Sequence, residues 1–193
     1  SVMSVVKKIL GTQINHEIVR LIKHFGGNAI SFNHNKYSII RATKRNNDEG
    51  PDLGYVGKVE KILNGEIKKK IDNGFIPVIA PIGKSKNNDY WNINADVVAG
   101  EVAQSLKAEK LILLTDVKGI GDSENKLISK ISLKKGQKVL KEKFIKGGMT
   151  PKLTAALEAK KNGVKSCHII DGRVPHAVLL EVLTEEGVGT MIS

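Results

Sequence analysis

Three polar side chains alternate with apolar ones in the stretch NINAD, and their spacing suits a ligand site. Asn92, Asn94 and Asp96 are each two residues apart. In an extended chain, side chains two apart point the same way, so two amides and a carboxylate would line one side. The plainer alternative is that the asparagines only cap the helix expected over residues 96–107.

A second polar cluster follows the apolar run 111–114, which is typical of a parallel strand buried on both faces. Thr115, Asp116 and Gly119 come where that strand would end. Ligands of open α/β sheets bind beyond the carboxyl ends of strands, so this loop is a candidate for ligand contacts. An ordinary turn beginning at Asp116 is the alternative.

The most informative single residue is Lys152. It falls in the first turn of a helix expected over residues 150–161, where the helix dipole disfavours a cation by roughly a few tenths of a kcal/mol. Gly147 and Gly148, just upstream, can bring backbone N–H groups close to a ligand. Together with the two polar clusters, this arrangement indicates phosphoryl-transfer chemistry. A solvent-facing lysine is the alternative, and the kinase motifs GxxxxGK[ST], HRD and DFG are absent from the sequence.

Alternating strands and helices must position these side chains. An amphipathic helix is expected over residues 13–25, because its apolar residues recur at helical spacing: Ile14, Ile18, Leu21, Ile22 and Phe25. Thr150 is the expected N-cap of the helix that carries Lys152, with Pro151 at its first position. The alternation predicts an α/β fold with a mainly parallel sheet flanked by helices. The other strands are expected at 28–32, 37–42, 53–62, 75–82, 166–170 and 188–192, and the other helices at 65–72, 133–143 and 175–184.

Composition narrows the class of protein. The 40% hydrophobic and 26% charged residues are typical of a soluble globular protein, and no apolar run approaches the roughly 20 residues of a membrane span. The single cysteine, Cys167, favours a reducing compartment. A net charge of +11 would suit a nucleic-acid binder, but the lysines are spread along the chain without interleaved aromatic residues, so no nucleic acid is expected as a partner.

Several motifs follow one another in an order that has a known counterpart. They are DLGYVGKV, GFIPVIAPIG, YWNINADVVAGEVAQSLKAEKLILLTDVKGI, KGGMTPKL and HIIDGRVPHAVLLEVLTEEGVGTMI. With them, essentially the whole chain resembles the amino-acid kinase family, which implies a three-layer α/β/α fold. The most similar branch phosphorylates the side-chain carboxylate of N-acetyl-L-glutamate with ATP, the second step of arginine biosynthesis, and Mg²⁺ would arrive with the nucleotide.

The resemblance also assigns roles to residues. Lys152 would neutralise the transferring phosphoryl group, and Asp96 would orient the catalytic lysines. Asn92 and Asn94 would bind N-acetyl-L-glutamate in a lobe formed by residues 1–109, and residues 110–193 would form the nucleotide-binding lobe. The nucleotide contacts implied are Thr115, Asp116, Val117, Lys118, Gly119, Ile120, Gly121, Phe144, Ile145, Lys146, Gly147, Gly148 and Met149.

The C-terminal motifs resemble the branch of the family that L-arginine inhibits. His168, Glu181 and Gly187 are the candidates for the arginine site. The same branch implies a homo-oligomer, either a dimer or a hexamer, and a nitrogen-signalling regulatory protein as a further partner. The implied location is the cytoplasm, or the stroma of a plastid.

One departure from the family's pattern matters. The family begins with a strand that carries a phosphate-binding lysine, then a glycine pair, then an arginine that grips the substrate carboxylate, and the printed sequence has none of these. The resemblance therefore predicts that the first third of the enzyme is missing and that this chain alone is inactive. Three alternatives stay open: an aspartate or glutamate kinase, a non-catalytic module that binds nucleotide or arginine, and a nucleic-acid binder.

Overall fold

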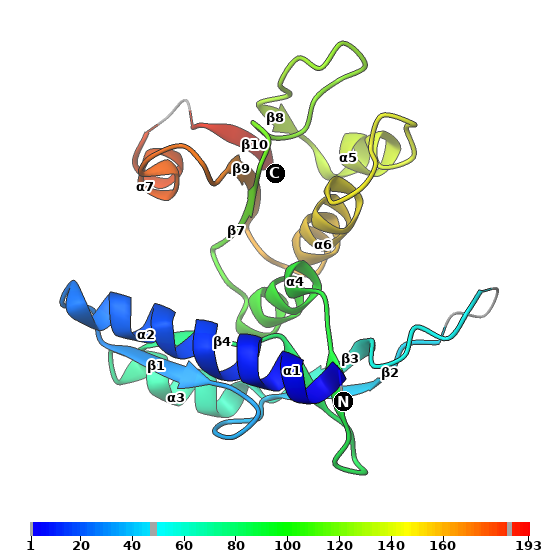
Figure 1. The fold of residues 1–193 in the computed structure, drawn as a ribbon. Helices are drawn as coiled ribbons and strands as arrows, with labels where there is room; N and C mark the ends of the chain where they lie inside the picture. The colour runs from blue at the N-terminus through cyan, green and yellow to red at the C-terminus, as the bar shows by residue number, and fades with distance from the viewer. Residues whose placement is uncertain (1, 47–49, 185–186) are drawn as a thin grey trace. The chain divides into compact units, whose positions relative to one another are not determined.

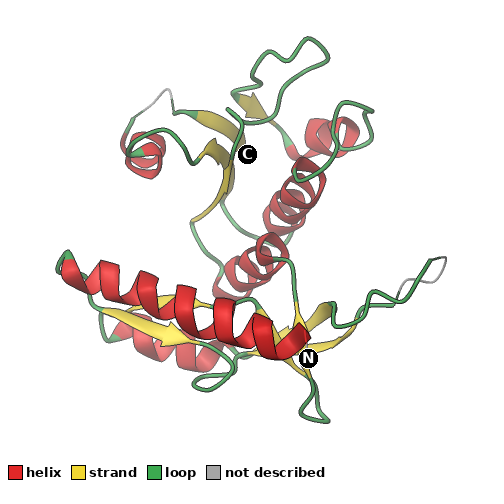
Figure 2. Ribbon diagram, in the orientation of Figure 1, coloured by secondary structure: helices red, strands yellow, loops and turns green. Residues whose placement is uncertain are grey.

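The structure is a computed structural model of the chain, and it describes residues 2–46, 50–184 and 187–193 (Figure 1). Contacts divide the chain into two compact units, Ser1–Val98 and Ala99–Ser193. Both units combine helices with strands (Figure 2), which confirms the predicted α/β class. The predicted assignment of one lobe to N-acetyl-L-glutamate and one to nucleotide stays a prediction.

The N-terminal unit begins with an unbroken run of helix. It consists of α1 (Val2–Lys8), a π-helical turn η1 (Ile9–Ile14) and α2 (Asn15–His24). The wider turn brings Gly11 into the interior, where an added Cβ would overlap the His34 ring. A glycine is therefore needed at this crossing of helix and loop.

Two small sheets complete the N-terminal unit. β1 (Ala29–Phe32) and β4 (Ile76–Ile79) pair in parallel, with α2 packed on both strands and α3 (Asn64–Asp72) packed on β4. The second sheet has the strand order β3–β2–β5–β6, formed by Gly57–Ile62, Ile40–Lys44, Ile82–Lys84 and Tyr90–Asn92. The prediction of one strand over residues 75–82 is wrong, because the chain leaves β4 after Ile79 and enters a different sheet at Ile82.

The apolar stripe of α2 does not face the core. Ile14, Ile18 and Leu21 are each 42% exposed, and Phe25 is 82% exposed. The buried position is Asn15 instead, whose side-chain amide donates to the Val78 carbonyl at 2.8 Å. The helical periodicity was predicted correctly, but the described residues leave most of the stripe uncovered.

The C-terminal unit is built on a mixed sheet of order β7–β9–β10–β8. Two of its pairings, β7–β9 and β10–β8, are parallel, whereas β9 and β10 run antiparallel. β7 is an edge strand in this sheet, and Leu114 on it is 51% exposed, so the prediction that this strand is buried on both faces is wrong. The strands are Lys110–Thr115, Ser166–Asp171, Gly189–Ile192 and Lys130–Ile131, in the order given.

Helices cover both faces of β9 (Figure 1). Cys167 and Ile169 share one apolar core with Leu153 and Leu157 of α6 (Met149–Lys161). His168 instead contacts Glu181 of α7 (Ala177–Leu183), with Nδ1 2.6 Å from Oε1. Burial raises the pKa of the Cys167 thiol to about 11, as expected of an inert core residue. The remaining helices are α4 (Ala95–Leu106) and α5 (Leu133–Val139).

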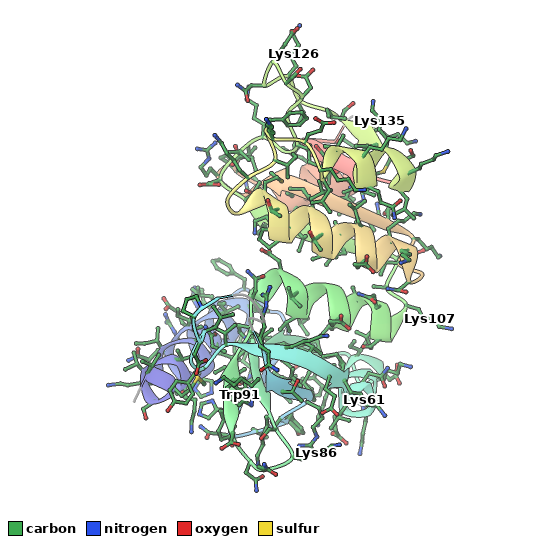
Figure 3. All side chains as sticks on the ribbon, turned by 90° about the vertical axis from the view of Figure 1, so that its right-hand side faces the viewer. Lys61, Lys86, Trp91, Lys107, Lys126 and Lys135 are labelled. Carbon is green, nitrogen blue, oxygen red and sulfur yellow. The ribbon has the colours of Figure 1, made fainter. Side chains whose placement is uncertain are left out.

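The surface carries lysines from many different elements. Figure 3 shows Lys61, Lys86, Lys107, Lys126 and Lys135 extending outward, from β3, from α5 and from loops between elements. This is the distribution of a solvated basic surface. Within the ranges that the structure describes, no helix combines the length and the apolar character that crossing a membrane requires.

Candidate functional site

The NINAD stretch turns from strand to helix instead of staying extended. Asn92 ends β6, and its backbone N–H donates to the Tyr55 carbonyl at 2.9 Å. Asn94 caps α4, because its side-chain oxygen accepts from the backbone N–H groups of Asp96 at 2.9 Å and Val97 at 3.3 Å. The prediction that the three polar side chains line one side of a strand is wrong, and Asp96 lies in the first helical turn.

A pocket of about 580 Å³ lies beside Asn94, within the N-terminal unit. Its cations come from the end of β2 and from β3, which makes it suited to a dianionic ligand. Asn92 is not among its lining residues. Sequence analysis did not single out these cations, because no local pattern brings Lys44 and Arg45 together with Lys58. Residues 47–49, between them in the sequence, lie outside the described residues. The lining residues are Lys44, Arg45, Asn46, Val56, Gly57, Lys58, Ile93, Asn94 and Val97.

The polar loop after β7 forms the base of a hairpin. The backbone N–H of Ile128 donates to the Ile120 carbonyl at 2.8 Å, and Gly121 pairs with Leu127. At the tip, the Asp122 carboxylate accepts the backbone N–H groups of Glu124 and Lys126, at 2.8 and 3.0 Å. Hydrogen bonds at its base and at its tip therefore hold the hairpin in one conformation.

This hairpin and the loop before α6 enclose a second pocket, of about 360 Å³, within the C-terminal unit. Two segments far apart in the sequence, both predicted to contact nucleotide, therefore line one cavity. Thr115, Asp116, Ile120, Gly147 and Gly148 are predicted contacts that do not line it. The lining residues are Val117, Lys118, Gly119, Gly121, Asp122, Asn125, Leu127, Phe144, Ile145, Lys146 and Met149.

Lys152 lies in the first turn of α6 and is partly buried. The helix begins at Met149 with Gly148 at the N-cap position, so the prediction that Thr150 is the cap is wrong. No side chain caps this helix end, and a Cβ added at Gly147 or Gly148 would meet nothing within 4 Å. The start of α6 therefore combines a helix N-terminus without a side-chain cap, a Met149 N–H that donates to the Lys146 carbonyl at 3.3 Å, and a lysine in the first turn, an arrangement that favours an anion.

The composition of the second pocket fits a nucleotide. Leu127, Phe144 and Met149 provide an apolar surface for a base, while Lys118 and Lys146 provide positive charge for phosphates. Among the described residues, no group of three or more His, Cys, Asp or Glu side chains is arranged to hold a metal ion.

The three candidates for an effector site lie together. His168 Nδ1 lies 2.6 Å from Glu181 Oε1, and the other Glu181 oxygen accepts the backbone N–H of Val188 at 2.6 Å. Gly187 has φ +63°, and a Cβ there would approach Glu181 Oε2 to 2.8 Å. The contacts bring the three residues into one cluster, in which His168 and Glu181 are buried, Gly187 is half-buried and the Glu181 carboxylate is the central group.

Sequence reasoning did not single out Asp171 and Arg173 of the DGR motif. The Asp171 carboxylate accepts the backbone N–H and Nε of Arg173 at 3.0 and 2.9 Å, and Nη2 at 2.9 Å. The bonds from the Arg173 side chain lower the pKa of the Asp171 carboxyl to about 2. A carboxylate and an arginine two residues apart, at the end of a strand, were the available signal.

The fold and the two pockets define a class of protein. Residues 1–171 match the Amino acid kinase family, and the chain belongs to this family. It is 44% identical to the acetylglutamate kinase of Herminiimonas arsenicoxydans over 98% of its own length, and it spans 66% of that relative.

Solved structures agree on the fold. The N-acetylglutamate synthase of Neisseria gonorrhoeae, complexed with coenzyme A and N-acetyl-glutamate, matches 99% of this chain and 43% of its own, with a TM-score of 0.89 and 24% identity. The same synthase complexed with coenzyme A and L-arginine matches 86% of this chain and 38% of its own, with a TM-score of 0.75 and 26% identity. Because a synthase shares this fold, the fold alone does not define the activity.

Proposed function

We propose that this protein phosphorylates the side-chain carboxylate of N-acetyl-L-glutamate with ATP, in the second step of arginine biosynthesis. The observation that carries the proposal is 44% identity to an acetylglutamate kinase over 98% of the chain, although the chain spans only 66% of that relative. The test is transfer of the γ-phosphoryl group of ATP to N-acetyl-L-glutamate, compared with transfer to aspartate, to glutamate and to water.

The pocket beside Asn94 is the proposed site for N-acetyl-L-glutamate. Its cations, Lys44, Arg45 and Lys58, suit the two carboxylates of that substrate. Lys44 also pairs with Asp52 at 2.7 Å, so binding would exchange one carboxylate partner for another. The family resemblance also assigns Asn92 to substrate binding, and we keep this assignment because Asn92 ends β6, two residues before Asn94.

The pocket between the 119–128 hairpin and the loop before α6 is the proposed nucleotide site. ATP supplies the phosphoryl group when it is bound, and Mg²⁺ is expected to be carried with it. Attack of a carboxylate oxygen on phosphorus needs neutralisation of charge and in-line placement more than a strong base. We assign the neutralisation to Lys152 at the start of α6, and the orientation of the catalytic lysines to Asp96.

We infer that L-arginine regulates the enzyme through the Glu181 cluster. A synthase at 26% identity has been solved with L-arginine bound, which supports arginine as a ligand of this fold. Both Glu181 oxygens already have partners, His168 and the Val188 N–H. Arginine can therefore bind here only if its guanidinium replaces one of these partners or shares an oxygen with it.

We infer that a second copy of the chain covers the exposed stripe on α2. Antiparallel packing about a two-fold axis makes the same patch meet itself. If the axis passes between Ile18 and Leu21, Ile18 meets Leu21 of the second copy and Ile14 meets Phe25, so each of these four exposed residues gains an apolar neighbour. A dimer is the smallest assembly that would bury this apolar stripe. A hexamer, a nitrogen-signalling partner and a cytoplasmic or plastid location stay predictions.

A further inference from the structure

We propose that Thr190 is a positioning residue for the nucleotide pocket, an inference that rests on the proposed nucleotide site. The Thr190 hydroxyl accepts the backbone N–H of Ile120 at 2.8 Å, and neither residue is exposed. Gly119 and Gly121, the neighbours of Ile120 on either side, both line the pocket. One buried hydrogen bond thus fixes the peptide between two pocket-lining residues.

The backbone at Gly119 is fitted to Thr190 as well. Its φ of +145° is a conformation that residues with a Cβ rarely adopt. A Cβ at Gly119 would lie 2.8 Å from Thr190 Oγ1 and 3.1 Å from the Thr190 backbone nitrogen. The pocket loop therefore lies directly against β10, and a side chain at this glycine would push the two apart.

Ile120 also holds the hairpin that forms one wall of the pocket. Its carbonyl accepts the N–H of Ile128 at 2.8 Å, which closes the hairpin whose residues Asp122, Asn125 and Leu127 complete the lining. A buried backbone N–H without an acceptor is unfavourable in free energy, so without the Thr190 hydroxyl the peptide at Ile120 would rotate toward another acceptor. Such a turn would shift the hairpin wall along with it.

The sheet sets the position of Thr190 itself. Thr190 pairs with Ile169 in the antiparallel β9–β10 ladder, and the chain two residues earlier is held by the bond from Val188 N–H to Glu181. The hydroxyl is therefore supplied by a rigid element, which suits a group that must hold a loop in one conformation.

Two substitutions separate the hydroxyl from the shape of the side chain. Thr190→Val keeps the shape and loses the acceptor, whereas Thr190→Ser keeps the acceptor. Ile192→Val is the matched control, because Ile192 is also fully buried in β10 but belongs to the apolar core. The affinity of the 193-residue chain for a fluorescent ATP analogue is measured together with Tm for each variant.

We expect Thr190→Val to weaken nucleotide binding on the order of tenfold, as loss of one buried hydrogen bond would. Thr190→Ser and Ile192→Val should bind as the unchanged chain does, even where Tm falls. A Thr190→Val chain with lowered Tm and unchanged affinity would overturn the proposal, since Thr190 would then only stabilise the fold.

Gly119→Ala probes the same contact from the loop side, should Thr190→Val unfold the chain. Gly119→Ala should weaken binding of the ATP analogue to a similar degree, and an unchanged affinity would again overturn the proposal. If the unchanged chain bound no nucleotide at all, the proposed nucleotide site would fail and this inference with it. If the unchanged chain binds nucleotide and Thr190→Val binds it equally well, only this inference fails and the proposed function still stands.

Discussion

His168 Nδ1 and Glu181 Oε1 lie 2.6 Å apart inside the C-terminal unit, with side chains that are 4% and 5% exposed. Through its second oxygen, the same carboxylate holds the backbone of Val188 just before β10. One buried carboxylate thus connects a strand, a helix and the segment that leads to the last strand. A ligand that displaces a partner of the Glu181 carboxylate would therefore change contacts between β9, α7 and the segment before β10.

Glu181→Gln should abolish inhibition by arginine while leaving kcat nearly unchanged. The amide keeps the size of the side chain but loses the charge that pairs with a guanidinium. The measurement is an arginine titration of the purified full-length enzyme at subsaturating N-acetyl-L-glutamate. Glu158→Gln, on the exposed side of α6, is the control and should keep full sensitivity. Unchanged sensitivity in Glu181→Gln would move the arginine site elsewhere.

Lys152→Ala should lower kcat about a hundredfold or more and leave the affinity for ATP nearly intact. Removal of a group that acts only on the transferring phosphoryl group lowers kcat and kcat/KM together. Steady-state kinetics on the purified full-length enzyme gives both constants. Lys161→Ala, at the exposed end of the same helix, should behave as the unchanged enzyme does. A Lys152→Ala enzyme with near-normal kcat would contradict the assignment.

Leu21→Glu should convert the protein from dimer to monomer without unfolding it. Leu21 is 42% exposed in one chain, so a charge there is tolerated in the monomer, but it would be buried against the second copy. Analytical ultracentrifugation measures the mass, and circular dichroism checks the fold. Lys23→Glu, on the polar side of α2, should leave the mass unchanged. A dimeric Leu21→Glu protein would show that the stripe is not the interface.

Stability should fall as the pH drops below the ordinary histidine pKa of 6.5, in part because of His34. Burial lowers the pKa of His34 in the folded chain, and the nearby charge of Lys7 lowers it further. The unfolded state therefore binds the proton more readily, so this contribution is present above pH 6.5 and is lost as the pH falls toward the folded pKa. The Nδ1 atom of His34 is buried with no hydrogen-bond partner, and Tyr90 packs edge-on against the ring.

Thermal melts between pH 5 and pH 8 (roughly the range in which histidine titrates) test this contribution. His34→Gln should flatten the pH dependence of Tm, because glutamine does not titrate. His24→Gln, at the exposed end of α2, should leave the slope as it was. Equal slopes for the unchanged chain and His34→Gln would show that His34 does not contribute.

Local patterns predicted much of the architecture and part of the site. Apolar periodicity located α2, α4, α6 and β9 to within a few residues, since burial of one face dictates those patterns. The two glycine-bearing loops that were predicted to contact nucleotide line one pocket. A polar loop after an apolar strand and a lysine at a helix start are features that the sequence displays directly.

What the sequence could not predict depends on contacts between distant residues. The α2 stripe has helical periodicity, but periodicity does not say whether the same chain or another one covers it. Asn94 could cap a helix or line a strand, and only the turn of the chain into α4 decides between them. Thr190 is 70 residues from Ile120, so no local pattern reveals their hydrogen bond.

The proposed function is one reaction, and the measurement that tests it most directly follows the γ-phosphoryl group of isotopically labelled ATP. The purified full-length enzyme is incubated with MgATP and with N-acetyl-L-glutamate, glutamate or aspartate, and hydroxylamine converts the acyl phosphate to a hydroxamate with release of labelled phosphate. The proposed function predicts that turnover of labelled ATP and formation of the hydroxamate both depend on N-acetyl-L-glutamate and are both lost in Lys152→Ala. Turnover that prefers aspartate or glutamate, or that needs no acceptor, would contradict it.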